Sequence, residues 1–186
     1  MALRCVKLFV ASWLLLGCVG NAIDLDLDKC INLSKELLDS VNTTLSSEEI
    51  NKGFNCTSDL MNDITKATTV IACEPDLSSL KKTECTRQRK TAFDQVTCLR
   101  NITEDLLKYK AEFSKYQLKG LSKQLDKTLS KIDALIKVLP SSAKATFRKK
   151  REISFPDRMK LCEILQAFKV RTVTINRVMN YMKSRQ

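Results

Sequence analysis

Four stretches of the chain carry apolar residues at the spacing of one face of an α-helix, and the connections between them differ greatly in length. The stretches cover residues 28–45, 86–116, 118–139 and 157–183. In each, leucine, isoleucine, valine or phenylalanine recurs every three or four residues, as in an amphipathic helix. No comparable stretch alternates with a period of two. The pattern therefore predicts an all-α fold.

The connections constrain how four such helices can be arranged. Residues 46–85 and 140–156 form long links, whereas almost nothing separates the second stretch from the third. A helix of about 20 residues is roughly 30 Å long, and extended chain covers about 3.3 Å per residue. Both long links can thus run back along a helix, which favours an up-up-down-down four-helix bundle, the cytokine arrangement. An up-down-up-down bundle with oversized loops is the alternative.

The N-terminus is typical of a secretory signal peptide over residues 1–22. Basic Arg4 and Lys7 precede an apolar run over residues 8–19, and Gly20 and Ala22 are small residues at a predicted cleavage site. The apolar run is shorter than the roughly 20 residues that cross a bilayer, although an N-terminal anchor remains an alternative. We expect residues 23–186 to form one four-helix cytokine domain that is secreted and does not insert into membranes.

Six cysteines remain after removal of the signal peptide, and an even number in a secreted chain predicts three disulfides. Six cysteines allow 15 pairings, but the topology restricts them. The first two helices start at the same end, where Cys30 and Cys85 can meet. Cys56 follows the first helix and can reach Cys162 early in the fourth. The remaining pair is Cys73 with Cys98.

Enzymatic and metal-dependent functions are disfavoured by the composition. The chain has no histidine and only four glycines, which excludes Ser-His-Asp and Cys-His catalysis and leaves little material for phosphate-binding loops. No two cysteines have the CxxC spacing of a zinc site. We therefore expect a binding protein without metal or cofactor.

Surface chemistry is indicated by glycosylation sequons and by net charge. The sequons begin at Asn32, Asn42, Asn55 and Asn101. Asn32 and Asn42 should be better acceptors than Asn55, where closure of the Cys56 disulfide competes with glycan transfer.

The formal charge of +11 allows binding to heparan sulfate or another acidic partner; no nucleic-acid partner is expected. The basic run over residues 148–151 is interpreted as a solvated loop, a glycosaminoglycan site or a furin-type cleavage site.

The last predicted helix has a second face that is unusual for solvent. Opposite its core stripe lie two valines, a threonine, an arginine and a tyrosine: Val170, Val173, Thr174, Arg177 and Tyr181. Tyrosine and arginine are enriched at the centres of protein interfaces. Either a partner protein or the chain's own long crossover is expected to cover this face.

Three stretches resemble the interleukin-12 alpha subunit family. Residues 161–181 are similar to the family's last helix, residues 89–113 to its second helix, and residues 56–75 to its first crossover. The resemblance implies a long-chain helical cytokine of the interleukin-6 superfamily. It also implies pairing with a receptor-like beta subunit of immunoglobulin and fibronectin domains, two receptor chains on T cells and natural killer cells, Jak–STAT signalling, interferon-gamma production and Th1 responses.

The resemblance also implies roles for particular residues. It places Arg177 where the family inserts an arginine into an acidic pocket of the beta chain, with support from Arg171 and Tyr181. It agrees with the three disulfides above and leaves no cysteine for a bond between subunits, so a non-covalent heterodimer is expected. The alternatives are a sister alpha chain of the interleukin-23 type, a single-chain cytokine, or a basic heparin-binding or membrane-active defence protein.

Overall fold

The structure, a computed structural model, describes residues 25–56, 73, 93–117, 122–140, 151–152 and 154–186. Four long helices dominate: α2 (Leu27–Leu45), α5 (Gln95–Phe113), α6 (Ser122–Val138) and α7 (Phe155–Ser184). The short helix α3 (Glu48–Asn51) and the two-residue strands β1 (Tyr116–Gln117) and β2 (Arg151–Glu152) complete the described elements. The predicted all-α fold is confirmed.

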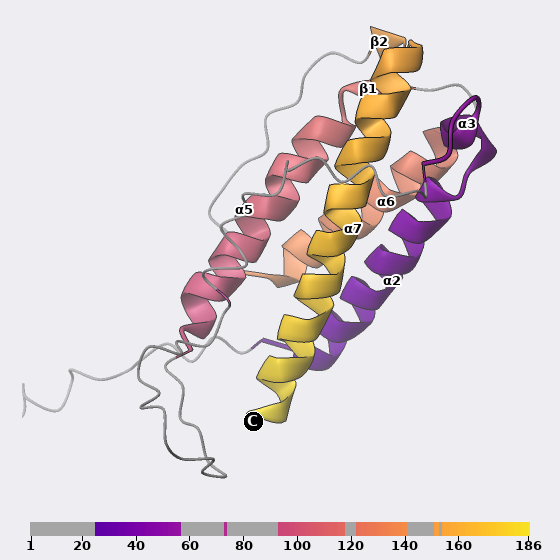
Figure 1. The fold of residues 1–186 in the computed structure, drawn as a ribbon. Helices are drawn as coiled ribbons and strands as arrows, with labels where there is room; N and C mark the ends of the chain where they lie inside the picture. Colours follow the sequence, from indigo (N-terminus) through magenta and orange to yellow (C-terminus); the bar gives the residue numbers. More distant parts are fainter. Residues whose placement is uncertain (1–24, 57–72, 74–92, 118–121, 141–150, 153) are drawn as a thin grey trace, which may run out of the picture.

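Helix α7 runs antiparallel to both α2 and α5, between which it lies in Figure 1. Near its C-terminus, Lys183 pairs with Asp28 at the start of α2 (2.8 Å). Near its N-terminus, Arg158 donates to the backbone oxygen of Lys52, just beyond the end of α2 and α3. Just before α5 begins, Phe93 contacts Tyr181, late in α7. These contacts fix the opposite directions of the helices.

Helix α6 is likewise antiparallel to α2 and α5, and Figure 1 places it behind α7. Lys131 on α6 pairs with Glu36 of α2, and Thr128 hydrogen-bonds both Ser40 and Thr44 at 2.8 and 3.1 Å. Because α6 and α7 both oppose α2 and α5, α2 is parallel to α5 and α6 to α7. The up-up-down-down topology predicted from the link lengths is confirmed.

Three of the helices begin at side chains that cap free backbone N–H groups. Asp26 accepts from the N–H of Lys29, and Asp94 from that of Thr97. At the start of α7, Ser154 and Asp157 form a reciprocal capping box, and the proline between them occupies the first turn. Such residues satisfy donors that have no partner within the helix. The second helix was predicted from residue 86, but it begins at Gln95; residues 86–92 lie outside the described part.

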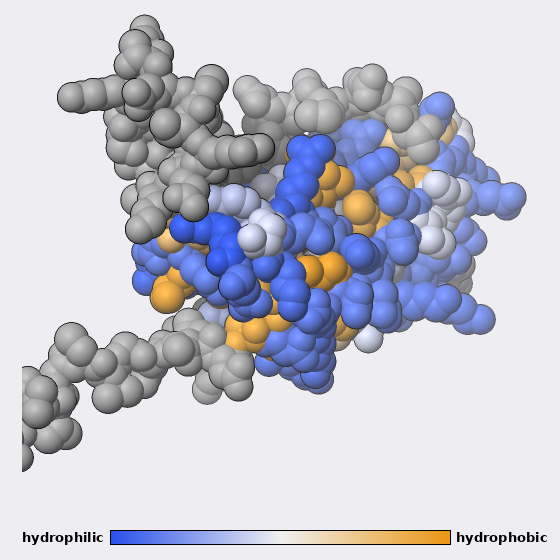
Figure 2. Space-filling view, turned by 90° about the horizontal axis from the view of Figure 1, so that it is seen from below, coloured by the Kyte–Doolittle hydropathy of each residue, from blue (hydrophilic) through white to orange (hydrophobic). Residues whose placement is uncertain are grey.

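The core is an aliphatic interior with one aromatic cluster between α5 and α7. Phe113 and Phe168 are fully buried with ring centroids 5.2 Å apart, and Tyr109 stacks within 4.6 Å of Phe168. Edge-to-face and tilted pairs of this kind add to the free energy gained by burial. Seen from below, the surface is mostly polar, with small apolar areas between polar ones (Figure 2). The bundle thus closes around its own core.

A short parallel ladder connects two links that are distant in sequence. Tyr116 pairs with Arg151 and Gln117 with Glu152. This ladder joins the link after α5 to the crossover before α7, at the upper end of the bundle in Figure 1. The sequence did not predict it, because two residues are too few to show a strand pattern.

Two of the three predicted disulfides are formed. Cys56 bonds Cys162, and Cys73 bonds Cys98. Cys30 is buried and forms no disulfide with any described cysteine; its predicted partner Cys85 lies outside the described residues. The Cys30–Cys85 bridge therefore stays a prediction, as does the signal peptide over residues 1–22, which also lies outside.

Candidate partner-binding face on helix α7

The outward face of α7 carries the residues that the sequence singled out. Arg177 is exposed, Val170 is 45% exposed, and Val173, Thr174 and Tyr181 are half-buried. At about 100° per residue, all five fall within roughly 100° of the helix circumference. The chain's own described residues do not bury this face, so it presents apolar side chains around one cation.

Arg177 has no ionic partner within the described part of the chain. No carboxylate there lies within ion-pair distance of its guanidinium, and it donates no hydrogen bond to a described residue. Its five N–H donors form a planar fork that suits a carboxylate. Flanking valine and threonine side chains would exclude water around such a contact, which strengthens an electrostatic interaction.

Tyr181 belongs to a small aromatic platform at the C-terminal end of this face. Its ring packs edge-to-face on Phe93, with centroids 5.3 Å apart. The Arg185 guanidinium lies 5.6 Å from the Tyr181 ring and 5.8 Å from the Phe93 ring. Phe93 and Arg185 were not among the predicted site residues. Phe93 reaches Tyr181 only through the antiparallel packing of the α5 end on α7, whereas Arg185 lies one helical turn after Tyr181.

The structure corrects the position of Arg171, which was grouped with the outward face. Its side chain is only 3% exposed and lies 3.5 Å, Nε to Oδ2, from the carboxylate of Asp105 on α5. Arg171 lies six positions before Arg177, so the two point about 120° apart around the helix. Arg171 is therefore an interior residue of the bundle and not a part of the exposed surface.

Asp105 and Arg171 lie beside the aromatic cluster. Burial raises the pKa of the Tyr109 hydroxyl, and the positive charge of Arg171 opposes part of that rise, while Asp105 adds to it. The Nε and Nη1 atoms of Arg171 have no hydrogen-bond partner among the described residues. The pair thus places two opposite charges in a mostly apolar region between α5 and α7.

The α2 side of α7 is fixed by polar contacts. Ser34 donates to Asn176 Oδ1 at 2.7 Å, and Asn176 donates back to the Ser34 backbone oxygen at 3.1 Å. On the opposite side, Asp105 and Phe93 contact Arg171 and Tyr181 of α7. Helix α7 is thus fixed against both α2 and α5. The outward face therefore has a defined orientation before any partner binds.

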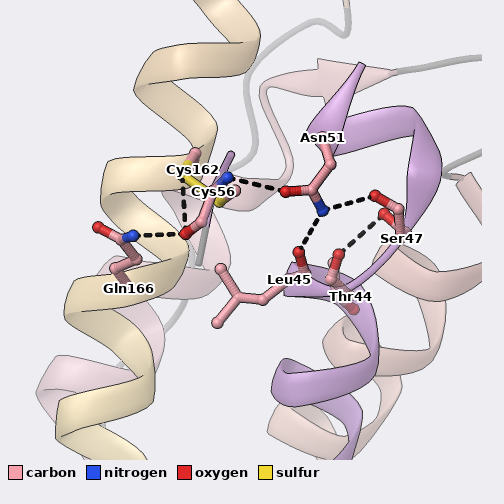
Figure 3. The surroundings of a disulfide bond; sticks show 7 residues. All are labelled: Thr44, Leu45, Ser47, Asn51, Cys56, Cys162 and Gln166. Atoms are coloured by element: carbon pink, nitrogen blue, oxygen red, sulfur yellow. Dashed lines mark hydrogen bonds between the residues drawn. A yellow bond between two sulfur atoms is a disulfide. The ribbon is translucent and has the colours of Figure 1, made fainter. Parts of the chain in front are cut away.

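The N-terminal half of α7 is bound to the end of α2 through a disulfide and Asn51 (Figure 3). The Cys56 backbone N–H donates to Asn51 Oδ1 at 2.8 Å, and Gln166 donates to the Cys56 backbone oxygen. Asn51 in turn donates to the backbone oxygens of Leu45 and Ser47. One half-buried asparagine thus joins helix α2, helix α3 and the disulfide loop.

The glycan acceptors differ in their surroundings. Asn32 and Asn55 are exposed, whereas Asn42 and Asn101 are half-buried. Asn101 Nδ2 donates to the Thr97 backbone oxygen at 2.8 Å. Their occupancy stays a prediction. Of the basic run, residues 148–150 lie outside the described part.

The described residues offer no metal centre and no membrane span. No group of three or more acidic, cysteine or histidine side chains that could hold an ion occurs among them. None of the described helices is both long and apolar enough to cross a bilayer.

Comparison with known proteins agrees with the helical bundle. The model of the interleukin-12 alpha subunit family matches residues 20–185. The chain belongs to the interleukin-12 alpha subunit family. The interleukin-12 alpha subunits of Macaca mulatta and Homo sapiens are 34% and 33% identical to it, each comparison covering 83% of both chains. That of Rattus norvegicus is 33% identical over 95% of this chain and 96% of its own length.

Membership of the interleukin-12 alpha family settles the class of protein. The family is one of cytokines and not of enzymes. The resemblance of residues 161–181 is thus confirmed at the level of the family. Within α7, Arg177 is exposed and Arg171 is not.

Proposed function

We propose that this chain is the alpha subunit of a secreted interleukin-12-type heterodimer. Its partner is a receptor-like beta subunit of immunoglobulin and fibronectin domains, which docks on the outward face of α7. The heterodimer then engages two receptor chains on T cells and natural killer cells and drives Jak–STAT signalling, interferon-gamma production and Th1 responses. Family membership supports the general role, and α7 supports the docking surface.

The observation that carries the docking surface is the environment of Arg177. Its guanidinium is exposed and has no acidic partner among the described residues, while Val173, Thr174 and Tyr181 around it are half-buried. A partner that supplies a carboxylate there gains a charge-assisted, bidentate contact. The apolar neighbours provide the surrounding dry rim that hot spots require.

The experiment is co-expression with candidate beta subunits, followed by affinity measurement of Arg177→Ala by surface plasmon resonance. We expect binding to weaken by a factor of about 30 or more, equivalent to about 2 kcal/mol, because the partner's carboxylate is left buried without its counter-charge. The free subunit should stay folded, since Arg177 makes no ion pair with the described residues.

Lys169→Ala is the matched control. Lys169 is an exposed cation on the same helix, about 80° around it from Arg177. If only net charge governed association, both variants would weaken binding equally. Unchanged affinity for Arg177→Ala would remove this residue from the interface, and no capture of any beta subunit by the unaltered chain would contradict the heterodimer itself.

A further inference from the structure

A polar hollow lies where α2, α3 and α6 meet, and one of its walls is a glycan acceptor. Asn42 lines it together with Ser46, Glu48, Glu49 and Gln124. Every lining residue has a polar side chain, and the open volume is about 640 Å³. The hollow is wide open to solvent, so a group attached to Asn42 can enter it. None of the lining residues belongs to α7, so the hollow is separate from the proposed docking face.

Asn42 is free to carry a substituent into this hollow. Its side chain donates no hydrogen bond to any described residue, whereas Asn101 is held by the Thr97 backbone oxygen. Thr44, the third residue of the sequon, is in contrast hydrogen-bonded inside the bundle. Thr44 is fully buried, and its hydroxyl contacts the Ser40 backbone oxygen and Thr128 Oγ1 at 2.9 and 3.1 Å.

The burial of Thr44 determines whether the glycan is attached before or after α2 packs on α6. A transferase must reach the whole Asn-X-Thr sequon, and α6 covers the Thr44 hydroxyl in the folded bundle. A glycan at Asn42 is therefore attached before α2 packs on α6. The corner then closes with the sugar already present.

We propose that Asn42 carries an N-linked glycan whose protein-proximal sugars occupy this hollow and bridge α2 to α3 and α6. Sugar hydroxyls are donors for Glu48, Glu49 and Gln124. Gln124 Oε1 has no hydrogen-bond partner among the described residues, and a turn of its side chain toward the hollow would supply one. The covalent attachment gives a high effective concentration, so weak contacts suffice.

The element that gains from this contact is α3. A helix of four residues has almost no stability of its own, and Asn51 and the Arg158 contacts to the Glu49 and Lys52 oxygens hold it on one side. The sugars would contact and stabilise the opposite side of α3. Removing the glycan should therefore increase local opening of residues 46–51.

The test uses the full chain, co-expressed with its beta subunit in glycosylating cells, with Asn32→Gln as the matched control for Asn42→Gln. Asn32 is on the same helix, is exposed and does not line this hollow. We expect amide hydrogen exchange over residues 46–51 to become about fivefold faster in Asn42→Gln and to be unchanged in Asn32→Gln.

A second measurement keeps the glycan and alters the hollow. Under native conditions, a peptide-N-glycosidase should release the Asn42 glycan about tenfold more slowly than the Asn32 glycan, because its attachment point is covered. Gln124→Ala preserves the sequon and should accelerate release at Asn42 only. An unmodified Asn42 in mass spectra, equal release rates at the two sites, or no change in exchange on glycan loss would each overturn the proposal.

Discussion

Arg171 and Arg177 lie on one helix, yet their surroundings give them different roles. Arg171 is enclosed beside Asp105 and Tyr109, and Arg177 faces outward among valine and threonine side chains. An interior arginine affects the stability of the chain, whereas an exposed one in an apolar setting affects association. Substitutions at the two positions should therefore be distinguishable by separate measurements of stability and binding.

Arg177→Lys tests whether the geometry of the guanidinium matters beyond its charge. An ammonium keeps the positive charge but lacks the planar fork of donors. We expect this variant to recover only part of the affinity lost in Arg177→Ala, and to show a steeper loss of affinity with added salt. Full recovery in surface plasmon resonance would show that charge alone is recognised.

Removing the carboxylate of Asp105 should destabilise the free subunit. In Asp105→Ala, the Arg171 charge stays buried without its counter-ion, which typically lowers the free energy of unfolding by about 3–5 kcal/mol. The double variant Asp105→Leu/Arg171→Met should be much less destabilised, because replacing both charges leaves none stranded. Urea denaturation measures the free energy of unfolding of both variants. Equal destabilisation of the two variants would indicate that lost packing, and not a stranded charge, is responsible.

At the scale of the elements, the ends of α7 should differ in their sensitivity. Ser154→Ala removes one half of the capping box and should lower the free energy of unfolding by about 1 kcal/mol. Ser184→Ala is the control at the other end, where the exposed hydroxyl donates only to the Tyr181 backbone oxygen; a change within about 0.5 kcal/mol is expected there. Thermal and chemical denaturation of both variants measure the difference. A smaller effect of Ser154→Ala than of Ser184→Ala would contradict it.

The sequence predicted the long elements well because periodicity is a local property. The first and fourth helices, expected over 28–45 and 157–183, are Leu27–Leu45 and Phe155–Ser184. Helix α3 was missed because four residues show no period. The capping role of Asp94 was also missed, so the apolar stripe was extended too far toward the N-terminus of α5.

The candidate site was predictable only in part. Helical geometry placed Val170, Thr174 and Arg177 on one face, and the same geometry puts Arg171 about 120° away. Its pairing with Asp105, however, depends on how α5 packs against α7. The same is true of the Phe93–Tyr181 contact, because residues so distant in sequence carry no local signal of their proximity.

At the scale of the whole molecule, the bundle topology determines which cysteines can meet. Two predicted pairs are formed, and the third should be found as Cys30–Cys85 by peptide mapping of the non-reduced, secreted protein. If Cys30 were a thiol instead, burial, followed by the charge of Asp26, would raise its pKa to about 11. It would then be neutral and unreactive at neutral pH. Alkylation of Cys30 after denaturation without reductant would contradict the third bridge.

The heterodimer itself should be non-covalent. Among the described cysteines, Cys56, Cys162, Cys73 and Cys98 are already bonded within the chain, and Cys30 is completely buried. A bond to the beta subunit needs an accessible thiolate, which none of these provides. The co-purified subunits should therefore separate on a denaturing gel without reductant, while native size exclusion shows one complex. A reductant-sensitive band of summed mass would contradict this expectation, and its loss in Cys85→Ala would trace the bond to Cys85, released from an open Cys30–Cys85 bridge.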